Sequence, residues 1–445
     1  MTRFNWHIRK NLSLAIPVMI GQLGQIMVGF ADNIMVGHVG KVPLAAASLA
    51  NSIYITFLVF GIGLSYVISP QTAKADGEND HAQLKSILKH ALLVCGSAGI
   101  VLSMMVVSGS YLLPYLNQPE DVVVIAIPYL QVIGLSLVPL MIFQAMRQFL
   151  EGLARTRGPM LIIIITNILN VIFNYLLIFG KLGFPELGLL GAGISTLFAR
   201  CVMCIIIYAY LFHGGRNSVY TLGFKFRKFS RSMINKLLRL GIPMGMQFTF
   251  EVTTFSFAAI MVGWLGATQL AAHQIAINLA SITYMAATGI SAAATIRVGN
   301  QLGRKDLKTM QMASFTCLFL VTIFMTICAL AFILLRHFLP TMYIEDLEVI
   351  RLASSLLVIA ALFQLSDGIQ VVGLGSLRGI SDVKIPTIIT LISYWVIAIP
   401  AAYILAFQFK MGAVGVWWGL LIGLTIAAIW LNLRFKKVSQ IMLGT

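Results

Sequence analysis

One stretch of this sequence occurs twice, and the repeat constrains the fold more than any other feature. Residues 16–80 fall on residues 242–306 under a single shift of 226 positions, with no gap. Identical residues coincide along the stretch, including the Met-Val-Gly tripeptides at 35–37 and 261–263. Further on, a Leu-Glu-Gly at 150 is echoed by a Leu-Arg-Gly at 377, a shift of 227. The sequence therefore predicts two copies of one structural unit.

The composition indicates where such a repeat folds. Hydrophobic residues make up 59% of the chain and charged residues only 10%, and the mean hydropathy is +0.91. No soluble core needs this much apolar surface, whereas apolar segments of about 20 residues are the length that crosses a bilayer as a helix. The segments are too long for barrel strands, and a helix satisfies its own backbone hydrogen bonds in lipid. We count twelve such segments, at roughly 13–36, 46–70, 86–111, 122–144, 159–179, 190–213, 237–263, 270–296, 310–335, 346–372, 384–408 and 412–434.

The basic residues predict how these segments are oriented. With the amino terminus inside, most of the 31 lysines and arginines fall in inner segments, and seven of them lie between Arg216 and Arg239. The outer segments hold only Lys41, Lys181, Arg336, Arg351 and Lys410. Because cytoplasmic segments carry such an excess, we expect both termini in the cytoplasm. The same asymmetry accounts for the net charge of +16, so nucleic-acid binding is not expected.

The position of the basic stretch defines the domain organisation. Six segments precede it and six follow, so both halves enter the membrane from the same side and the repeat is parallel. We predict an all-α membrane protein with twelve transmembrane helices in two pseudo-symmetric six-helix lobes. The lobes are residues 1–215 and 237–445, joined by a cytoplasmic basic linker at 216–236. Pro17 and Pro243 occupy matching places in the first helix of each lobe, where proline favours a kink that is either a static bend or a hinge.

Three acids lie at membrane depth: Asp32, Glu251 and Asp367. An ionised carboxylate at that depth costs about 2.5–3.5 kcal/mol on insertion scales. Arg200 is the only basic residue at a similar depth, so an ion pair with it would still leave two acids unpaired. Asp32 and Glu251 also break the repeat, because neither has an acidic counterpart in the other copy. Unpaired acids on an otherwise shared scaffold indicate a site for a cation or a proton.

Polar side chains accompany the acids in the same segments. Asn167, Asn170 and Asn174 share one helix face by their spacing, and interhelical hydrogen bonding is the ordinary role of such residues. We favour Asn174 and Gln247 as residues that line a site. His273 is a lone histidine within a span, and packing is the simpler interpretation of it than a proton relay.

Other functional classes lack their motifs. There is no G-x-x-x-x-G-K-[ST] loop for ATP and no H-E-x-x-H pair for a metalloprotease. The five cysteines fall within predicted spans, and Cys201 and Cys204 have no second pair with which to hold a metal. We therefore expect neither an enzyme nor a bound cofactor.

Asp32 within the run GFADNIMVG at 29–37, Glu251, and Asp367 ahead of GSLRG at 375–379 make this chain resemble one family. It resembles the MATE family of multidrug and toxic compound extrusion transporters, and the similarity covers essentially the whole chain. Within that family it looks like the NorM-like branch, which carries acids in the second lobe at the positions of Glu251 and Asp367. The DinF-like branch lacks that pair and relies on acids of the first lobe.

The resemblance implies a secondary antiporter that exports cationic, amphipathic compounds in exchange for Na⁺ or H⁺ by alternating access. Glu251 and Asp367 would bind the coupling ion, with Na⁺ as the metal. Phe363, one turn before Asp367, lacks the hydroxyl that a tyrosine there would offer, so H⁺ stays an alternative. The compound would contact Asp32, Asn174, Gln247, Gln274, Asn278 and Phe363. We expect a monomer in the bacterial inner membrane whose partners are small molecules and membrane lipids.

Three rival classes predict different residues. A lipid-linked precursor flippase would share the two-lobe architecture but would hold an anionic pyrophosphate with several basic residues at membrane depth, where this chain has Arg200. A passive channel would repeat its polar rings, whereas these acids are asymmetric. A membrane-embedded enzyme would need a catalytic constellation that the motifs do not supply. Transport of a dye cation, with one ion gradient imposed at a time, separates these classes.

Overall fold

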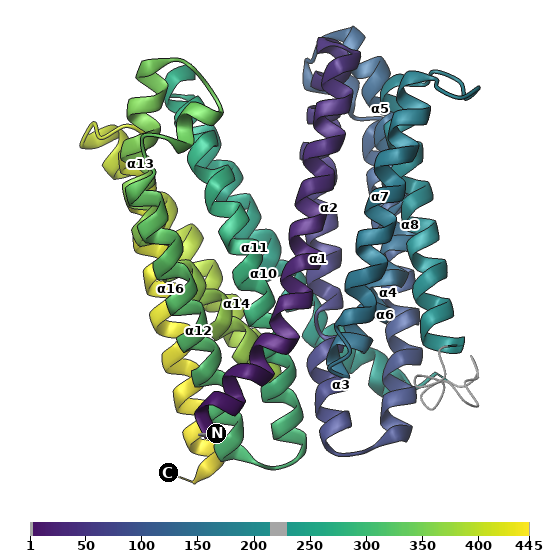
Figure 1. Cartoon of the computed structure of the whole chain (residues 1–445), viewed down its shortest axis with the longest axis vertical. Helices are drawn as coiled ribbons and strands as arrows, with labels where there is room; N and C mark the ends of the chain where they lie inside the picture. Colours follow the sequence, from purple (N-terminus) through teal and green to yellow (C-terminus); the bar gives the residue numbers. More distant parts are fainter. Residues whose placement is uncertain (1–2, 214–228, 445) are drawn as a thin grey trace. The chain divides into compact units, whose positions relative to one another are not determined.

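The computed structural model describes residues 3–213 and 229–444, and most of them are helical (Figure 1). The helices of the first half are α1 (Arg3–Val39), α2 (Lys41–Ser65), α3 (Ile68–Gly77), α4 (His81–Ser110), η1 (Leu113–Leu116), α5 (Glu120–Leu135), α6 (Leu137–Gly152), α7 (Arg157–Phe179) and α8 (Gly188–His213). Those of the second half are α10 (Arg231–Gly263), α11 (Ala267–Gly303), α12 (Leu307–Leu334), η2 (Leu339–Met342), α13 (Leu347–Gly379), α14 (Lys384–Leu391), η3 (Ile392–Ala398), α15 (Ile399–Tyr403), η4 (Ile404–Gln408) and α16 (Ala413–Leu443). Residues 216–228 of the expected basic linker lie outside the described residues. The rest of that expected linker is helical from Arg231 on, as the start of α10.

The expected spans are present as helices. In the described part of the chain, eleven helical stretches are long and apolar enough to cross a membrane, among them α2 with α3, α5 with α6, and the stretch from α14 to η4. The seventh expected span is α10, a helix of 33 residues. Helix α10 is not among the eleven apolar stretches, because Gln247, Glu251 and several threonines lie along it. With α10 added to the eleven apolar stretches, the twelve-helix prediction is confirmed.

The helices form two compact units, and each of two helices contributes to both. One unit comprises residues 1–19 and 246–445, and the other comprises residues 20–245. Helix α1 therefore passes from one unit to the other after Met19, and α10 does so after Gly245. These positions differ by 226, the shift of the sequence repeat, and each lies two residues after the proline inside its helix, Pro17 or Pro243.

The repeat predicted from sequence recurs in local geometry. Asp80 caps α4 by accepting a hydrogen bond from the backbone N–H of Gln83 at 2.9 Å. Asp306, 226 positions later, caps α12 in the same way through Thr309, at 3.0 Å. A side-chain oxygen at this position satisfies one of the unpaired N–H groups of the first helical turn. Matching caps show that the two copies share backbone geometry as well as sequence.

Glycines of α16 let the span from α14 to η4 pack closely against it. Gly415, Gly419 and Gly423 are spaced four apart on one face of α16, a pattern that allows membrane helices to approach each other. A Cβ atom at Gly415 would lie 2.6 Å from the backbone nitrogen of Ala406. A Cβ at Gly423 would lie 2.5 Å from the backbone oxygen of Ser393. This close packing fixes the position of η3, a π-helical turn that carries Tyr394.

The start of α1 is tied into the unit formed by the second half of the chain. The Arg297 guanidinium donates hydrogen bonds to Asn11 Oδ1 at 2.7 Å, to the His7 carbonyl at 3.2 Å and to His7 Nδ1 at 3.0 Å. Asn11 Nδ2 in turn donates to the Thr316 hydroxyl at 2.8 Å. These side chains connect α1 to α11 and α12, which explains why residues 1–19 group with the second half.

Candidate functional site

Asp32, the acid of the first half, is held by an asparagine. Asn174 Nδ2 on α7 donates to Asp32 Oδ1 at 2.5 Å and also lies 3.2 Å from Asn170 Oδ1. Asn170 and Asn174 are buried, and Asn174 Oδ1 has no hydrogen-bond partner within the described part of the chain. The shared face predicted from their spacing is therefore directed at the acid, and it leaves one amide oxygen available to a ligand.

Arg200 belongs to the same polar cluster but is not an ion-pair partner of Asp32. Its guanidinium donates to the hydroxyls of Tyr54 and Ser136 and lies 5.5 Å from the centre of the Tyr54 ring. It interacts with Asp32 through the longer-range electrostatic attraction between the two charges. The cluster therefore has one carboxylate and one cation, each solvated by neutral hydrogen-bonding groups.

The second pair of acids, Glu251 and Asp367, comes together on α10 and α13. Both side chains are buried, at 5% and 3% exposure, and the two carboxylates lie close enough to interact electrostatically. The Tyr284 hydroxyl on α11 donates to Glu251 Oε1 at 3.2 Å. Two carboxylates at this separation repel each other when both are ionised, and a cation or a proton relieves that repulsion.

Tyr394 brings a further hydroxyl to the two acids. It is fully buried in the π-helical turn η3, and it interacts electrostatically with both Glu251 and Asp367. Its hydroxyl has no hydrogen-bond partner among the described residues. Pro400 follows in the same span, and proline and π-helical turns are common where a membrane helix departs from regular hydrogen bonding at a functional site.

Amide side chains beside the acids are also only partly satisfied. Gln247 lies one turn before Glu251, and its amide nitrogen Nε2 has no hydrogen-bond partner among the residues that the structure describes. Gln364 and Gln370 flank Asp367 by three positions on each side, so they share its helix face. Among the described residues, Gln370 Nε2, Gln370 Oε1 and Gln364 Nε2 have no hydrogen-bond partner. Gln364 Oε1 accepts a hydrogen bond from the Thr283 hydroxyl at 2.7 Å. Buried polar atoms are normally paired, so these atoms are donors and acceptors that water or an ion can satisfy.

The structure places the other expected site residues in different surroundings. Phe363 is buried, and its ring packs against Phe255 and Trp417, with ring centres 6.1 and 5.7 Å apart. Gln274 is exposed and Asn278 half-buried on α11. Their roles in binding a compound stay predictions.

His273 is a packing residue in this structure. The indole N–H of Trp417 donates to His273 Nδ1 at 3.2 Å, and the histidine is 1% exposed. An indole nitrogen is a donor only, so Nδ1 must be the unprotonated nitrogen of a neutral imidazole. The structure therefore favours the packing interpretation of His273.

Sequence reasoning missed Tyr284 and Tyr394. A tyrosine within an apolar span usually finds a partner for its hydroxyl, and that requirement was the available signal. Nothing in the spacing connects either tyrosine to Glu251, which lies 33 and 143 positions away. Among the described residues there is also no group of three or more His, Cys, Asp or Glu side chains that could hold a metal. Any metal here would rely on the two carboxylates and on hydroxyl or amide oxygens.

Comparison with known proteins gives a consistent result. The MatE family model matches residues 17–176 and again residues 243–404, two matches that begin 226 positions apart. The chain is 33% identical over 437 residues to the probable multidrug resistance protein NorM of Idiomarina loihiensis, covering 97% of this chain and 94% of that protein. It is 32% identical to the multidrug resistance protein MdtK of Yersinia pseudotuberculosis, covering 99% of this chain and 97% of that one.

Solved structures share the fold. An outward-facing multidrug resistance MATE family transporter of the MOP superfamily superposes with a TM-score of 0.89 at 21% identity, covering 99% of this chain and 97% of that one. The eukaryotic MATE transporter AtDTX14 superposes with a TM-score of 0.88 at 20% identity, covering 99% and 98%. At these identities the likeness concerns the fold alone.

Proposed function

Because this chain belongs to the MatE family, in its NorM-like branch, we propose that it exports cationic, amphipathic compounds in exchange for Na⁺. The relatives that match nearly its whole length are named as multidrug resistance proteins. In this proposal, transport proceeds by alternating access and is driven by the ion gradient. The proposal also places the chain as a monomer in the bacterial inner membrane with both termini in the cytoplasm, where the excess of basic residues is retained.

One observation supports the coupling site: the cluster of Glu251, Asp367, Tyr284 and Tyr394. Two buried carboxylates and two hydroxyls supply only oxygen atoms, and oxygen is the ligand that hard cations prefer. Tyr394 interacts electrostatically with both acids, and its hydroxyl makes no hydrogen bond among the described residues. A bound Na⁺ would offset the repulsion between the carboxylates and coordinate this hydroxyl.

Tyr394 bears on the choice between Na⁺ and H⁺. Phe363 has no oxygen to offer near Asp367, and for this reason the sequence left H⁺ as an alternative coupling ion. Tyr394 offers such an oxygen from another helix, so the absence of a tyrosine at 363 no longer weighs against Na⁺. The exchange of one proton between the two acids is the second candidate, and it needs no hydroxyl.

Asp32 and Asn174 provide the proposed contact for the exported compound. Asp32 carries the charge that attracts an organic cation, and the free Asn174 Oδ1 adds an acceptor beside it. The Tyr54 ring, which already contacts Arg200, is an aromatic surface of the kind that binds organic cations. Gln247, Gln274, Asn278 and Phe363 are proposed as further contacts. No bound cofactor is required.

Arg200 also bears on the rival flippase. An anionic pyrophosphate would need several cations, whereas this cluster offers the single guanidinium of Arg200, two of whose five N–H donors are engaged by Tyr54 and Ser136. The cluster is therefore better suited to an organic cation near Asp32 than to a polyanion.

The experiment is transport of a fluorescent dye cation in proteoliposomes, with a Na⁺ gradient, a pH gradient or a membrane potential imposed separately. The proposal expects dye movement against its gradient when Na⁺ is high on the opposite side, and loss of this movement in Glu251→Gln. Dye movement driven only by the pH gradient would reject Na⁺ and support the proton alternative. No dye movement under any gradient, from protein that folds correctly, would contradict the proposed exporter.

A further inference from the structure

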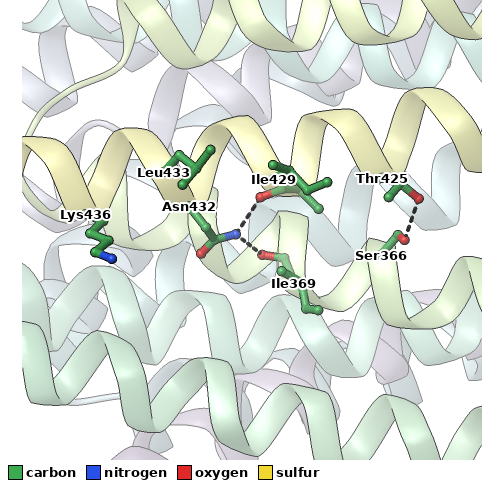
Figure 2. Close-up of a pocket in the computed structure, with 8 residues that line it drawn as sticks. Ser366, Ile369, Thr425, Ile429, Asn432, Leu433 and Lys436 are labelled. Carbon is green, nitrogen blue, oxygen red and sulfur yellow. Dashed lines mark hydrogen bonds between the residues drawn. The ribbon is translucent and has the colours of Figure 1, made fainter.

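A groove on the surface of the second-half unit lies outside the residues assigned to ion and drug. It is formed by α13 and α16 and has a volume of about 400 Å³ (Figure 2). That volume is within the range of about 300–1,000 Å³ found for small-molecule sites. Figure 2 shows Ser366 and Thr425 at one end of the groove and Lys436 at the other.

The middle of the groove presents hydrocarbon. Ile369, Ile429 and Leu433 line it, and the last two are 52% and 57% exposed. The amide nitrogen of Asn432, the polar side chain in this part, is already bonded. Asn432 Nδ2 donates to the backbone carbonyls of Ala428 at 2.8 Å and Ile369 at 3.2 Å.

The end formed by Ser366 and Thr425 is closed to further polar contact. Their hydroxyls are 2.8 Å apart and bond to each other. A ligand that fills the groove therefore meets mainly hydrocarbon until it reaches Asn432 and Lys436 at the other end, and this favours an alkyl chain.

The length of the groove fits one leaflet of a bilayer. Thr425 and Lys436 are eleven residues apart on one continuous helix, which corresponds to about 16 Å at the rise of an α-helix. Half of a hydrocarbon core about 30 Å thick has nearly the same length. A chain that lies along the groove would thus end at the level of the lipid headgroups, beside Lys436.

The charge at that end selects the headgroup. Among the described residues Lys436 forms no ion pair, whereas its neighbour Arg434 is bonded to Asp382 at 2.9 Å. An ammonium group at the membrane surface attracts a phosphate, and basic pockets between membrane helices bind anionic headgroups. A cationic compound of the exported class would be repelled by the same lysine.

We propose that this groove binds one anionic phospholipid, with an acyl chain along α13 and α16 and the headgroup phosphate at Lys436. The assignment of that lipid to the cytoplasmic leaflet rests on the orientation proposed above, whereas binding itself does not. The groove borders the face of α13 beside Ser366, the residue before Asp367, so the lipid supports the helix that carries the coupling acid.

The test is lipid binding to the purified full chain, measured by native mass spectrometry with phosphatidylglycerol and with phosphatidylcholine. We expect a single tight site for phosphatidylglycerol. Lys436→Gln should weaken it about fivefold, the equivalent of about 1 kcal/mol for one basic residue at the membrane surface. Lys437→Gln is the matched control, because it removes the same charge from the next residue, which does not line the groove. Equal weakening by both variants would show diffuse charge attraction and overturn the proposal.

Filling the groove gives a second, independent measurement. Ile429→Trp should reduce binding of both lipids, because the indole occupies the path of the chain without entering the protein core. Ile422→Trp, also exposed on α16 but outside the groove, should leave both unchanged. If phosphatidylglycerol binds Ile429→Trp as it binds the unmodified protein, the groove is not the site. If a dye cation competes with phosphatidylglycerol there, the groove belongs to the drug path and the lipid proposal fails. None of these measurements depends on transport, so they stand apart from a failure of Na⁺ coupling.

Discussion

At the scale of single residues, the protein keeps three carboxylates in a medium that penalises charge, and each has a different set of neighbours. Asp32 is bonded to an amide, whereas Glu251 and Asp367 face each other with tyrosine hydroxyls around them. Because burying such groups is costly, each acid at membrane depth is by default a functional-site hypothesis. Substitutions that remove one charge or one hydroxyl therefore test each role separately.

Replacing Asp367 with Asn should uncouple transport. A cation that crosses a potential of 100 mV supplies about 2.3 kcal/mol per charge, and it drives transport only if it binds one conformation better than the other. Without Asp367 we expect bound drug to be retained when Na⁺ is added, while drug affinity itself persists. Drug release from purified protein, followed by fluorescence during a Na⁺ titration, measures this. Asp382→Asn is the control and should behave as the unmodified protein. Asp382 lies just after the end of α13, the helix that carries Asp367, and accepts a hydrogen bond from Arg434. Wild-type Na⁺ dependence in Asp367→Asn would contradict the assignment of the ion site.

Removing the hydroxyl of Tyr394 should weaken Na⁺ binding without changing the packing of the ring. A hydrogen-bonding contact to a charged group contributes about 1.5–3 kcal/mol, so Tyr394→Phe should lower Na⁺ affinity about tenfold or more. Isothermal titration with Na⁺ gives the affinity directly. Tyr403→Phe in the same span is exposed and far less packed, and it should have no effect. An unchanged affinity in Tyr394→Phe would remove this hydroxyl from the site and return weight to the proton alternative.

The buried ion pair between Arg147 and Glu151 makes a stability prediction. The two groups are 2.7 Å apart, and both side chains are almost fully buried. Because Glu151→Gln leaves the guanidinium buried without its counter-charge, the free energy of unfolding should fall by about 3–5 kcal/mol. Glu78→Gln, which removes the partner of Lys74 from a half-exposed pair at 3.8 Å, should cost less than about 1 kcal/mol. Denaturant titrations of both variants in detergent compare the two, and equal losses would show that burial of the pair does not matter.

At the scale of elements, α1 and α10 are the two helices shared between the compact units. Each is continuous, each contains a proline, and each leaves its first unit two residues after that proline. A proline lowers the cost of bending because one backbone hydrogen bond is already missing. This symmetry favours the hinge interpretation of Pro17 and Pro243 over a static bend, since a static bend has no reason to coincide with both unit boundaries.

Restoring the missing hydrogen bond should stiffen these hinges. We expect Pro17→Ala and Pro243→Ala to slow drug transport several-fold, while drug affinity at equilibrium changes little because the site residues are untouched. Initial rates in proteoliposomes and dye binding in detergent separate the two effects. Pro128→Ala serves as the control, since this proline lies inside α5, which belongs to one unit only. If all three variants transport at the unmodified rate, the prolines are static bends.

At the scale of the whole molecule, the repeat and the charge asymmetry carry the prediction of how the chain is inserted. Matching caps at Asp80 and Asp306 place the equivalent loops of both copies in the same geometry. Copies with the same orientation require an even number of spans in each, and this agrees with six helices per half. The orientation proposed above rests on the excess of basic residues, since segments with such an excess are usually retained in the cytoplasm.

Single cysteines in a variant without the five native ones test that orientation. Lys181→Cys should react with a membrane-impermeant maleimide in intact cells, whereas Lys437→Cys should react only after permeabilisation. Both lysines are exposed, so access to the reagent depends on the side of the membrane alone. Ser218→Cys, in the basic linker outside the described residues, should behave like Lys437→Cys. The reverse labelling pattern would invert the proposed topology.

The sequence alone determined the features that depend on composition and period. Apolar length predicts the spans because a lipid environment admits few other structures, and the offset of 226 positions predicts the two copies because identical residues must occupy identical backbone environments. The three membrane-depth acids were also visible, since a charge in an apolar run stands out without any knowledge of its partners. The face shared by Asn170 and Asn174 followed from helical spacing.

Only the tertiary structure decided which distant groups meet. Glu251 and Asp367 are 116 positions apart, and Tyr394 reaches both from a π-helical turn that no spacing rule indicates. The packing of α16 glycines against that span brings it there, and such a contact depends on the shape of two surfaces rather than on either sequence. The sequence also did not predict that residues 1–19 group with the second half of the chain, because this depends on buried hydrogen bonds from Arg297 to His7 and Asn11. Local order follows from the chain's own period, whereas long-range contact depends on how two helices fit together.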